Sequence, residues 1–241
     1  MNNEQITITD KTIGEIVAEN YHTAGVFRKH GIDFCCGGDV TLRDSCLKNK
    51  IDPEQLTNEL LNLRTGHGSI AENYNQWSID FLIDYIINTH HSYVRNKTDE
   101  ILAYAKKVSK VHGRNNPENI EIYNLYSALV PELLEHLEAE ETVVFPLIKF
   151  INKMKQEDEP IEPQLYESLK RHLVEMLTDH DGAGGIMASI RELSHDYMPP
   201  GYACTTYRIL YQNLHDFEQD LHKHVHLENN ILFKKAEKLL V

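Results

Sequence analysis

The sequence predicts an all-α protein, in which a four-helix up-down bundle follows a small helical domain. Nearly every long segment carries helical and not alternating hydrophobic periodicity, as in residues 77–94, where apolar residues mark one broad face. The connections between the longer helical stretches are short and rich in proline, glycine and charge. Because short connections favour an antiparallel arrangement of consecutive helices, we expect an up-down bundle.

The first 66 residues are expected to form the small helical domain. They hold short helical units punctuated by glycines, and Pro53 after Asp52 is a favourable helix start. The segment RTGHGS, residues 64–69, is the predicted linker to the larger region.

The larger domain is expected over residues 76–239. Its four helical stretches are predicted at about 76–112, 117–154, 162–196 and 202–239, joined by GRNNPEN, QEDEPIEP and YMPPG. Pro131 and Pro146 predict kinks in the second helix, or an early end to it.

Composition excludes several classes of partner. Lys and Arg number 24 against 37 Asp and Glu, a formal charge of -13, so there is no basic footprint for nucleic acid or anionic lipid. No apolar run is long enough to span a membrane, and the polar start MNNEQITITDK lacks the apolar core of a signal peptide. The four cysteines are too few and too clustered for a secreted disulfide framework. We expect a cytoplasmic protein.

Two segments repeat one layout of ligand-type side chains. HLEAEETVVFP begins at His136 and HVHLENNILF begins at His224, and Glu140 and Glu228 follow these histidines by four residues. The offset between the two segments is 88 residues for both side chains. Positions four apart on a helix aim both side chains at one point, as metal coordination requires.

The repeat extends to the other two helices of the bundle. THHS at 89–92 resembles TDHD at 178–181, so each half is a hairpin with one histidine on its first helix. Packing the hairpins about a pseudo-twofold axis would bring four imidazoles and two carboxylates together: His91, His136, Glu140, His180, His224 and Glu228. Two metals sharing two bridging glutamates would use every group and leave open positions for a small ligand.

The ligand types suit iron, zinc or copper, and six of them favour two irons over a closed, thiolate-rich structural zinc site. Either half alone is more readily an ordinary polar face, and only the matched halves favour a metal. His90 is the main rival to His91. The other histidines outside the symmetric layout are expected nearby, at the surface or along an entry path: His112, His222 and His226.

The adjacent Cys35 and Cys36 are the second candidate site. Neighbouring α-carbons lie about 3.8 Å apart, below the usual range of about 4.4 to 6.8 Å, so a mutual disulfide is disfavoured. Thr41 and Asp44 resemble a capping box, and a helix start there would favour thiolate. The pair suits thiol exchange, electron delivery or transient iron binding; the alternative is two inert buried cysteines in a turn. The remaining cysteines are expected in the core: Cys46 and Cys204.

Several of these motifs resemble one known family. HLEAEETVVFP, DHDGAG with Asp179 before it, ACTTYRILY and HVHLENNILF are similar to the hemerythrin-like bundle of the Repair of Iron Centers family of ScdA/YtfE type. GIDFCCGG matches the small leading domain of that family, so the resemblance covers nearly the whole chain. One departure is Lys234, where the family pattern leads us to expect a proline.

The resemblance implies a non-heme, oxo-bridged di-iron centre. Its terminal ligands would be the four histidines, and Glu140 and Glu228 would be the bridges. It implies a stress-response role in restoring iron-sulfur clusters damaged by nitric oxide or oxidative stress, by supplying iron. The implied partners are damaged iron-sulfur proteins, nitric oxide or oxygen as small ligands, and a thiol reductant, with a monomer or a homodimer both open. A di-iron nitric oxide or oxygen reductase, or a reversible binder or sensor of these gases, remains the alternative, so enzymatic turnover stays an open question.

Overall fold

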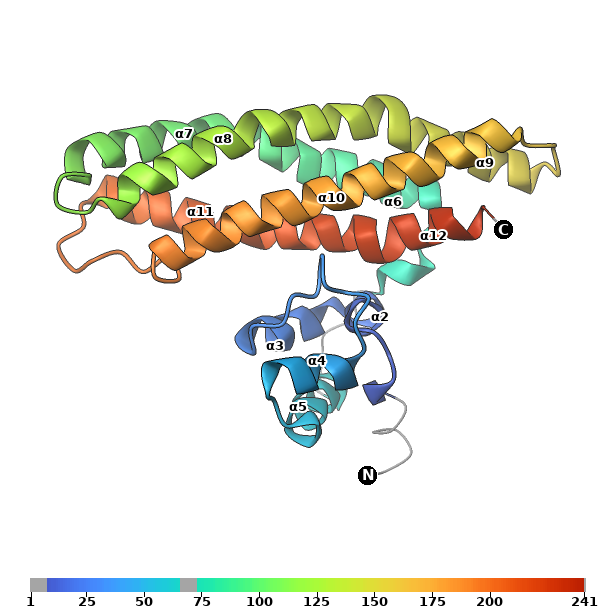
Figure 1. The fold of residues 1–241 in the computed structure, drawn as a ribbon, viewed down its shortest axis with the longest axis horizontal. Helices are drawn as coiled ribbons and strands as arrows, with labels where there is room; N and C mark the ends of the chain where they lie inside the picture. Colours follow the sequence, from blue (N-terminus) through green and yellow to red (C-terminus); the bar gives the residue numbers. More distant parts are fainter. Residues whose placement is uncertain (1–7, 66–72, 241) are drawn as a thin grey trace. The chain divides into compact units, whose positions relative to one another are not determined.

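The computed structural model describes residues 8–65 and 73–240, and every regular element in these ranges is a helix (Figure 1). The predicted all-α class is confirmed. Residues 66–69 of the predicted RTGHGS linker lie outside the described residues. In the described part of the chain, no helix combines the length and the apolarity needed to cross a membrane.

The chain divides into two compact units, residues 1–82 with 225–241, and residues 83–224. This division differs from the predicted domains at 1–66 and 76–239, because residues 225–241 belong with the first unit. The predicted domains remain a prediction. It crosses two helices, α6 (Ile79–Tyr85) and α11 (Thr205–Leu227).

The first unit is built on short helices, and side chains cap the starts of α2 and α4. Its elements before α6 are α2 (Ile13–Glu19), η1 (Tyr21–Thr23), α3 (Ala24–Lys29), α4 (Leu42–Asn49), α5 (Pro53–Thr65) and η2 (Tyr74–Gln76). Thr12 begins α2 with a capping box, in which its hydroxyl accepts from Glu15 N and its own N–H donates to the Glu15 carboxylate. Fully buried apolar side chains, Phe27 and Leu42 among them, form the core of this unit.

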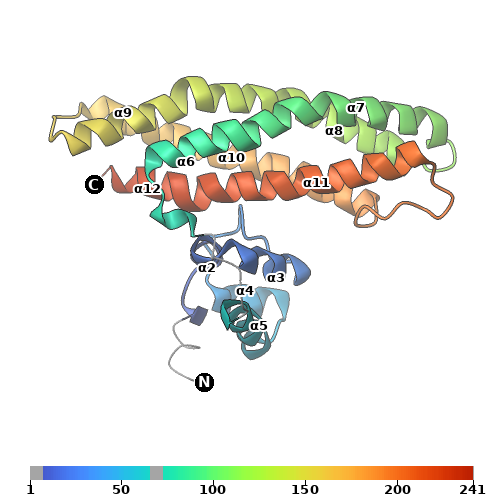
Figure 2. The same ribbon diagram turned by 180° about the vertical axis from the view of Figure 1, so that it is seen from behind.

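The second unit contains the bundle. Its long helices are α7 (Ser92–His112), α8 (Glu118–Ala139), α9 (Phe145–Gln156), α10 (Pro163–Leu193) and most of α11, and both views show them running lengthwise beside one another (Figures 1 and 2). Phe217 of α11 packs its ring 5.6 Å from Tyr126 of α8 and 6.3 Å from Tyr93 of α7. The four predicted helical stretches are therefore confirmed.

Three of the four stretches contain a π turn that the sequence did not predict. These turns are η3 (Ile86–His91), η4 (Glu140–Val144) and η5 (Glu228–Leu232), and α12 (Phe233–Lys238) follows the last. Each π turn begins or ends at a residue predicted to bind metal. Such turns are rare and occur frequently at functional sites.

Neither proline ends the second stretch. Pro131 lies inside α8, and Pro146 lies in the first turn of α9, directly after the π turn η4. Proline has no N–H to donate, and a first-turn position requires none. The third stretch ends three residues earlier than predicted, at Leu193. His195, Asp196 and Tyr197 all have positive φ, between 51° and 59°, and this left-handed backbone cannot continue a right-handed helix.

Candidate metal centre

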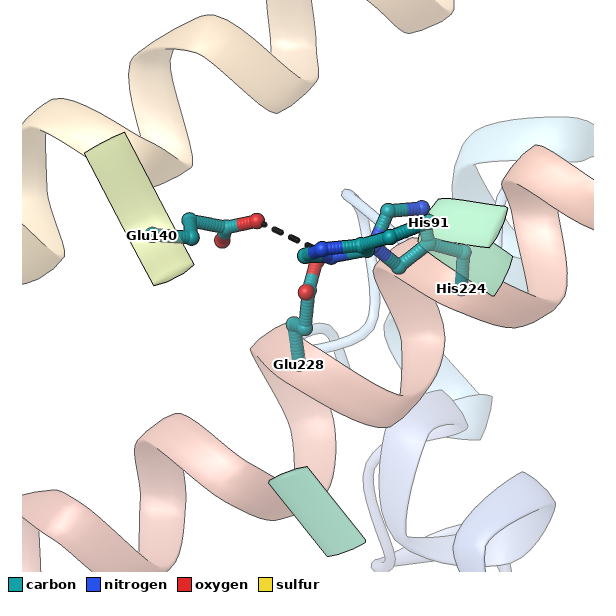
Figure 3. A group of neighbouring side chains, drawn as sticks. All are labelled: His91, Glu140, His224 and Glu228. Atoms are coloured by element: carbon teal, nitrogen blue, oxygen red, sulfur yellow. Dashed lines mark hydrogen bonds and ion pairs between the residues drawn. The ribbon is translucent and has the colours of Figure 1, made fainter. Parts of the chain in front are cut away.

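The six side chains predicted as ligands lie in two overlapping groups, and all six are buried. One group contains His91, Glu140, His224 and Glu228, and the other contains His136, Glu140, His180 and Glu228. Within each group the ligand atoms lie within 4.8 Å of one another. Figure 3 shows the first group, in which the two carboxylates reach the paired imidazoles from different helices. Each group thus has its own histidine pair, and the two glutamates are common to both.

The histidine pairs have the spacing of neighbouring ligands on one ion. The Nε2 atoms of His91 and His224 lie 3.1 Å apart, and those of His136 and His180 lie 2.9 Å apart. Two nitrogens that each bond a metal at about 2.1 Å, at a right angle, lie about 3.0 Å apart. The donor set of each pair therefore fits a metal ion without rearrangement.

The Glu140 carboxylate faces both histidine pairs. Its Oε2 lies 3.4 Å from His91 Nε2, and its Oε1 lies 3.5 Å from His136 Nε2 and 3.9 Å from His180 Nε2. Because each oxygen is directed at a different pair, the side chain has the placement that a carboxylate bridge between two ions needs.

Two carboxylates that were not predicted as site residues orient the imidazoles. Glu141 Oε1 lies 2.7 Å from His91 Nδ1, and Asp179 Oδ2 lies 3.2 Å from His136 Nδ1. A carboxylate at Nδ1 holds the proton there and leaves the Nε2 lone pair available to a metal. Burial raises the pKa of Glu141, but hydrogen bonds from Arg95 and His91 outweigh it, so its pKa is lowered and it is ionised at neutral pH. In the sequence, Glu141 directly follows Glu140 and Asp179 directly precedes His180, and both lie in or beside the motifs that resemble the family.

The structure distinguishes His91 from its rival His90. The Nδ1 atom of His90 lies 2.9 Å from Asp220 Oδ1, and its ring stacks on His224 at 5.6 Å with an interplanar angle of 5°. His90 is in neither group of ligand atoms, whereas His91 is in the first. His90 therefore supports the ring of a predicted ligand.

Two of the three other unassigned histidines, His226 and His112, lie in different settings. His226 is buried beside the rings of Tyr21 and Phe34, each 5.9 Å away. His112 Nε2 lies 3.5 Å from Cys204 Sγ. Cys204 is exposed, so its predicted core position is wrong; it lies in the connection directly before α11.

The Cys35–Cys36 loop is organised by one aspartate. Asp33 accepts backbone hydrogen bonds from the N–H groups of Cys35 (2.9 Å), Cys36 (3.1 Å) and Gly37 (3.0 Å). The two cysteines are free thiols with their sulfurs 3.9 Å apart, and Cys35 is buried while Cys36 is half-buried.

The predicted thiolate character is wrong for Cys35. A hydrogen bond with Cys36 and burial raise its pKa well above the ordinary value. Thr41 does cap α4, accepting from Asp44 N, but the helix begins at Leu42, six residues after Cys36. The thiols therefore lie outside the capped turn itself, where the field of a helix end is strongest. Cys46 is buried, as predicted.

The antiparallel helices and their buried histidine and glutamate groups define a hemerythrin-like metal-binding bundle. Residues 82–236 match the family described as Hemerythrin HHE cation binding domain, and residues 9–64 match a Domain of Unknown function (DUF542). The chain is 35% identical to an iron-sulfur cluster repair protein ScdA of Staphylococcus haemolyticus, over 95% of this chain and 99% of the relative. It is 33% identical to an iron-sulfur cluster repair protein YtfE of Dickeya chrysanthemi, over 94% of this chain and 96% of the relative. The chain belongs to this family of ScdA and YtfE proteins.

Proposed function

We propose that this chain acts in the cytoplasm to repair iron-sulfur clusters damaged by nitric oxide or oxidative stress, by supplying iron from a dinuclear centre. The observation that carries the proposal is the pair of ligand groups that share both glutamates. The names of the relatives support the choice of cluster repair.

The proposed cofactor is two non-heme iron ions joined by an oxo bridge. Each histidine pair would hold one ion as terminal ligands, and Glu140 and Glu228 would bridge them. Bound there, the pair would supply redox-active iron with open positions for nitric oxide or oxygen. The protein would hold the imidazoles in the required tautomer through Glu141 and Asp179. It would also exclude bulk water, because the ligand groups are buried.

The ligand chemistry favours a centre that can release iron. The set contains imidazole and carboxylate but no thiolate, and Fe²⁺ lies near the weak end of the affinity order for such ligands. Two bridging carboxylates balance only part of the charge of two cations in a buried site, which lowers the cost of losing one. Iron donation to a client is therefore chemically reasonable.

The cysteines are proposed to act on the client protein or on a thiol reductant. Two domains, at 1–66 and 76–239, would then separate thiol exchange or electron delivery from iron storage, and the separate family matches support that division. Cys36 is the more accessible thiol and would react first, since Cys35 is buried. The clients would be damaged iron-sulfur proteins.

The test is recovery of a damaged enzyme. Iron-loaded protein is added to an iron-sulfur enzyme inactivated by nitric oxide, and the regained activity is measured. The controls are metal-free protein and the same concentration of free Fe²⁺. We expect recovery above both controls. Recovery no greater than with free Fe²⁺ refutes the proposal, as does retention of all iron by the protein while it consumes nitric oxide with a reductant.

A further inference from the structure

We propose that Asp33, Cys35 and Cys36 form a second metal site, which binds one divalent cation with affinity for thiolate, such as Zn²⁺ or Fe²⁺. The site shares no ligand with the histidine and glutamate groups. It is proposed from its own geometry and does not depend on the repair function.

The three donor atoms already have the spacing that such an ion requires. All of them lie within 4.8 Å of one another. The two sulfurs are 3.9 Å apart, and Cys35 Sγ lies 3.2 Å from Asp33 Oδ1. Two thiolates bonded at about 2.3 Å to one tetrahedral ion lie about 3.8 Å apart. An ion can therefore bond both sulfurs without movement of the backbone.

The carboxylate is held in place before any ion arrives. Three consecutive backbone N–H groups, from Cys35 to Gly37, donate to the Asp33 side chain. These bonds fix the loop around the carboxylate, and carboxylate oxygens have lone pairs left for an ion. Asp33 itself is exposed, so the ion does not have to enter a closed cavity.

A second brace comes from the other end of the chain, inside the same compact unit. Asn230 Nδ2 donates to the carbonyl oxygens of Phe34 (3.2 Å) and Cys35 (3.0 Å). The Asn230 side chain fits there because residues 14 and 38 are glycines: a Cβ at Gly14 or at Gly38 would lie 2.3 Å from Asn230 Oδ1. The backbone on both sides of the sulfurs is thus tied down, as a preorganised site needs.

A disulfide between the two thiols does not compete with the ion. They are free and too close along the chain for an unstrained mutual disulfide. Three protein ligands leave one position of a tetrahedral ion open, whereas structural zinc sites are closed by four. The half-buried Cys36 and the exposed Asp33 place that open side toward solvent, so the ion is exchangeable. On binding, the two thiol protons leave to solvent as the sulfur–metal bonds form.

Co²⁺ is a suitable probe of this site, because thiolate bound to cobalt gives a charge-transfer band that imidazole and carboxylate ligands do not. Full-length protein with reduced thiols is titrated with CoCl₂, and the near-ultraviolet band is followed. We expect a band that saturates at one thiolate-bound Co²⁺ per chain and disappears on addition of Zn²⁺. Cobalt in the histidine and glutamate groups adds no such band.

Three variants and one matched control decide the assignment. Cys35→Ser and Cys36→Ser should each abolish the band. Asp33→Asn keeps an acceptor for the loop N–H groups. It should weaken Co²⁺ binding at least about tenfold, because the loss of a residue that only hydrogen-bonds to a metal ligand already weakens metal binding by that factor. Cys204→Ser removes a thiol elsewhere and should leave the titration unchanged.

The proposal is overturned if the parent shows no thiolate–cobalt band, or if the band survives in Cys36→Ser. Cys36 is half-buried, so this variant should keep the fold, which circular dichroism checks. Because cobalt binding is measured without a client, its failure would leave the repair proposal standing, and failed repair would leave this site standing.

Discussion

Gly38→Ala should destabilise the first compact unit through a single contact. A Cβ at this position lies 2.3 Å from Asn230 Oδ1, 2.9 Å from its Cγ and 3.0 Å from its Nδ2. No rotation of one terminal atom relieves all three contacts, so the Asn230 side chain has to leave. It then loses its hydrogen bonds to the carbonyl oxygens of Phe34 and Cys35.

The expected cost follows from these contacts. The two hydrogen bonds contribute about 1 kcal/mol each, and a side chain that has left no longer overpacks the space at residue 38. We therefore expect a loss of about 2 kcal/mol in the free energy of unfolding. The measurement is urea unfolding of full-length, metal-free protein, followed by circular dichroism.

A double-mutant cycle isolates the contact. Asn230→Ala alone should cost about 2 kcal/mol, from the lost hydrogen bonds to the carbonyl oxygens of Phe34 and Cys35. Once Asn230 is shortened, adding Gly38→Ala should cost less than about 0.5 kcal/mol more. Gly25→Ala is the matched control: a Cβ there meets nothing within 4 Å, and alanine in α3 should stabilise by about 0.5 to 1 kcal/mol. Additive costs of the two substitutions in the cycle, or equal effects at Gly38 and Gly25, would refute the reasoning.

Three further predictions concern the two sites. The protein should bind two irons with an oxo-bridged ferric absorption, and Glu140→Ala should abolish magnetic coupling while helical content survives; coupling that persists in this variant would show that Glu140 does not bridge. Glu141→Gln should weaken iron binding by about 10- to 100-fold, measured by chelator competition, whereas the exposed Glu138→Gln should not; equal affinities would contradict the role of Glu141 in orienting His91. Cys35→Ser with Cys36→Ser should leave the iron content of the bundle intact and impair repair of a damaged client, and loss of both irons would mean that the predicted ligand set is wrong.

The sequence predicted the bundle and the convergence of the six candidate ligands because both depend on spacing. Helical periodicity defines a face, and a repeat of His and Glu four residues apart directs both side chains to one point. The match between THHS and TDHD favoured His91 but left His90 as a rival, because the π turn Ile86–His91 changes the rotation per residue on which a helical pattern relies. The roles of Glu141 and Asp179 depend on contacts between helices, which a spacing within one helix does not report.

Other errors come from tertiary context. The thiolate prediction for Cys35 rested on the nearby cap at Thr41, whereas the hydrogen bond with Cys36 and the burial of the thiol raise its pKa. The end of the third helical stretch depends on three consecutive left-handed residues, none of which is glycine. Histidine and aspartate adopt this conformation more often than most residues, but neither requires it, so the sequence did not predict where the helix ends.

The brace from Asn230 has a consequence for how the polypeptide is made. Residues 225–241 complete the compact unit that begins with the first helices, so that unit is discontinuous in the chain. A ribosome synthesises residues 8–65 long before it synthesises Asn230, and domains otherwise tend to fold in order of synthesis. The cysteine loop can therefore reach its final form only after the last turns of the chain have emerged. An isolated N-terminal fragment would lack the side chain that fills the space over Gly14 and Gly38.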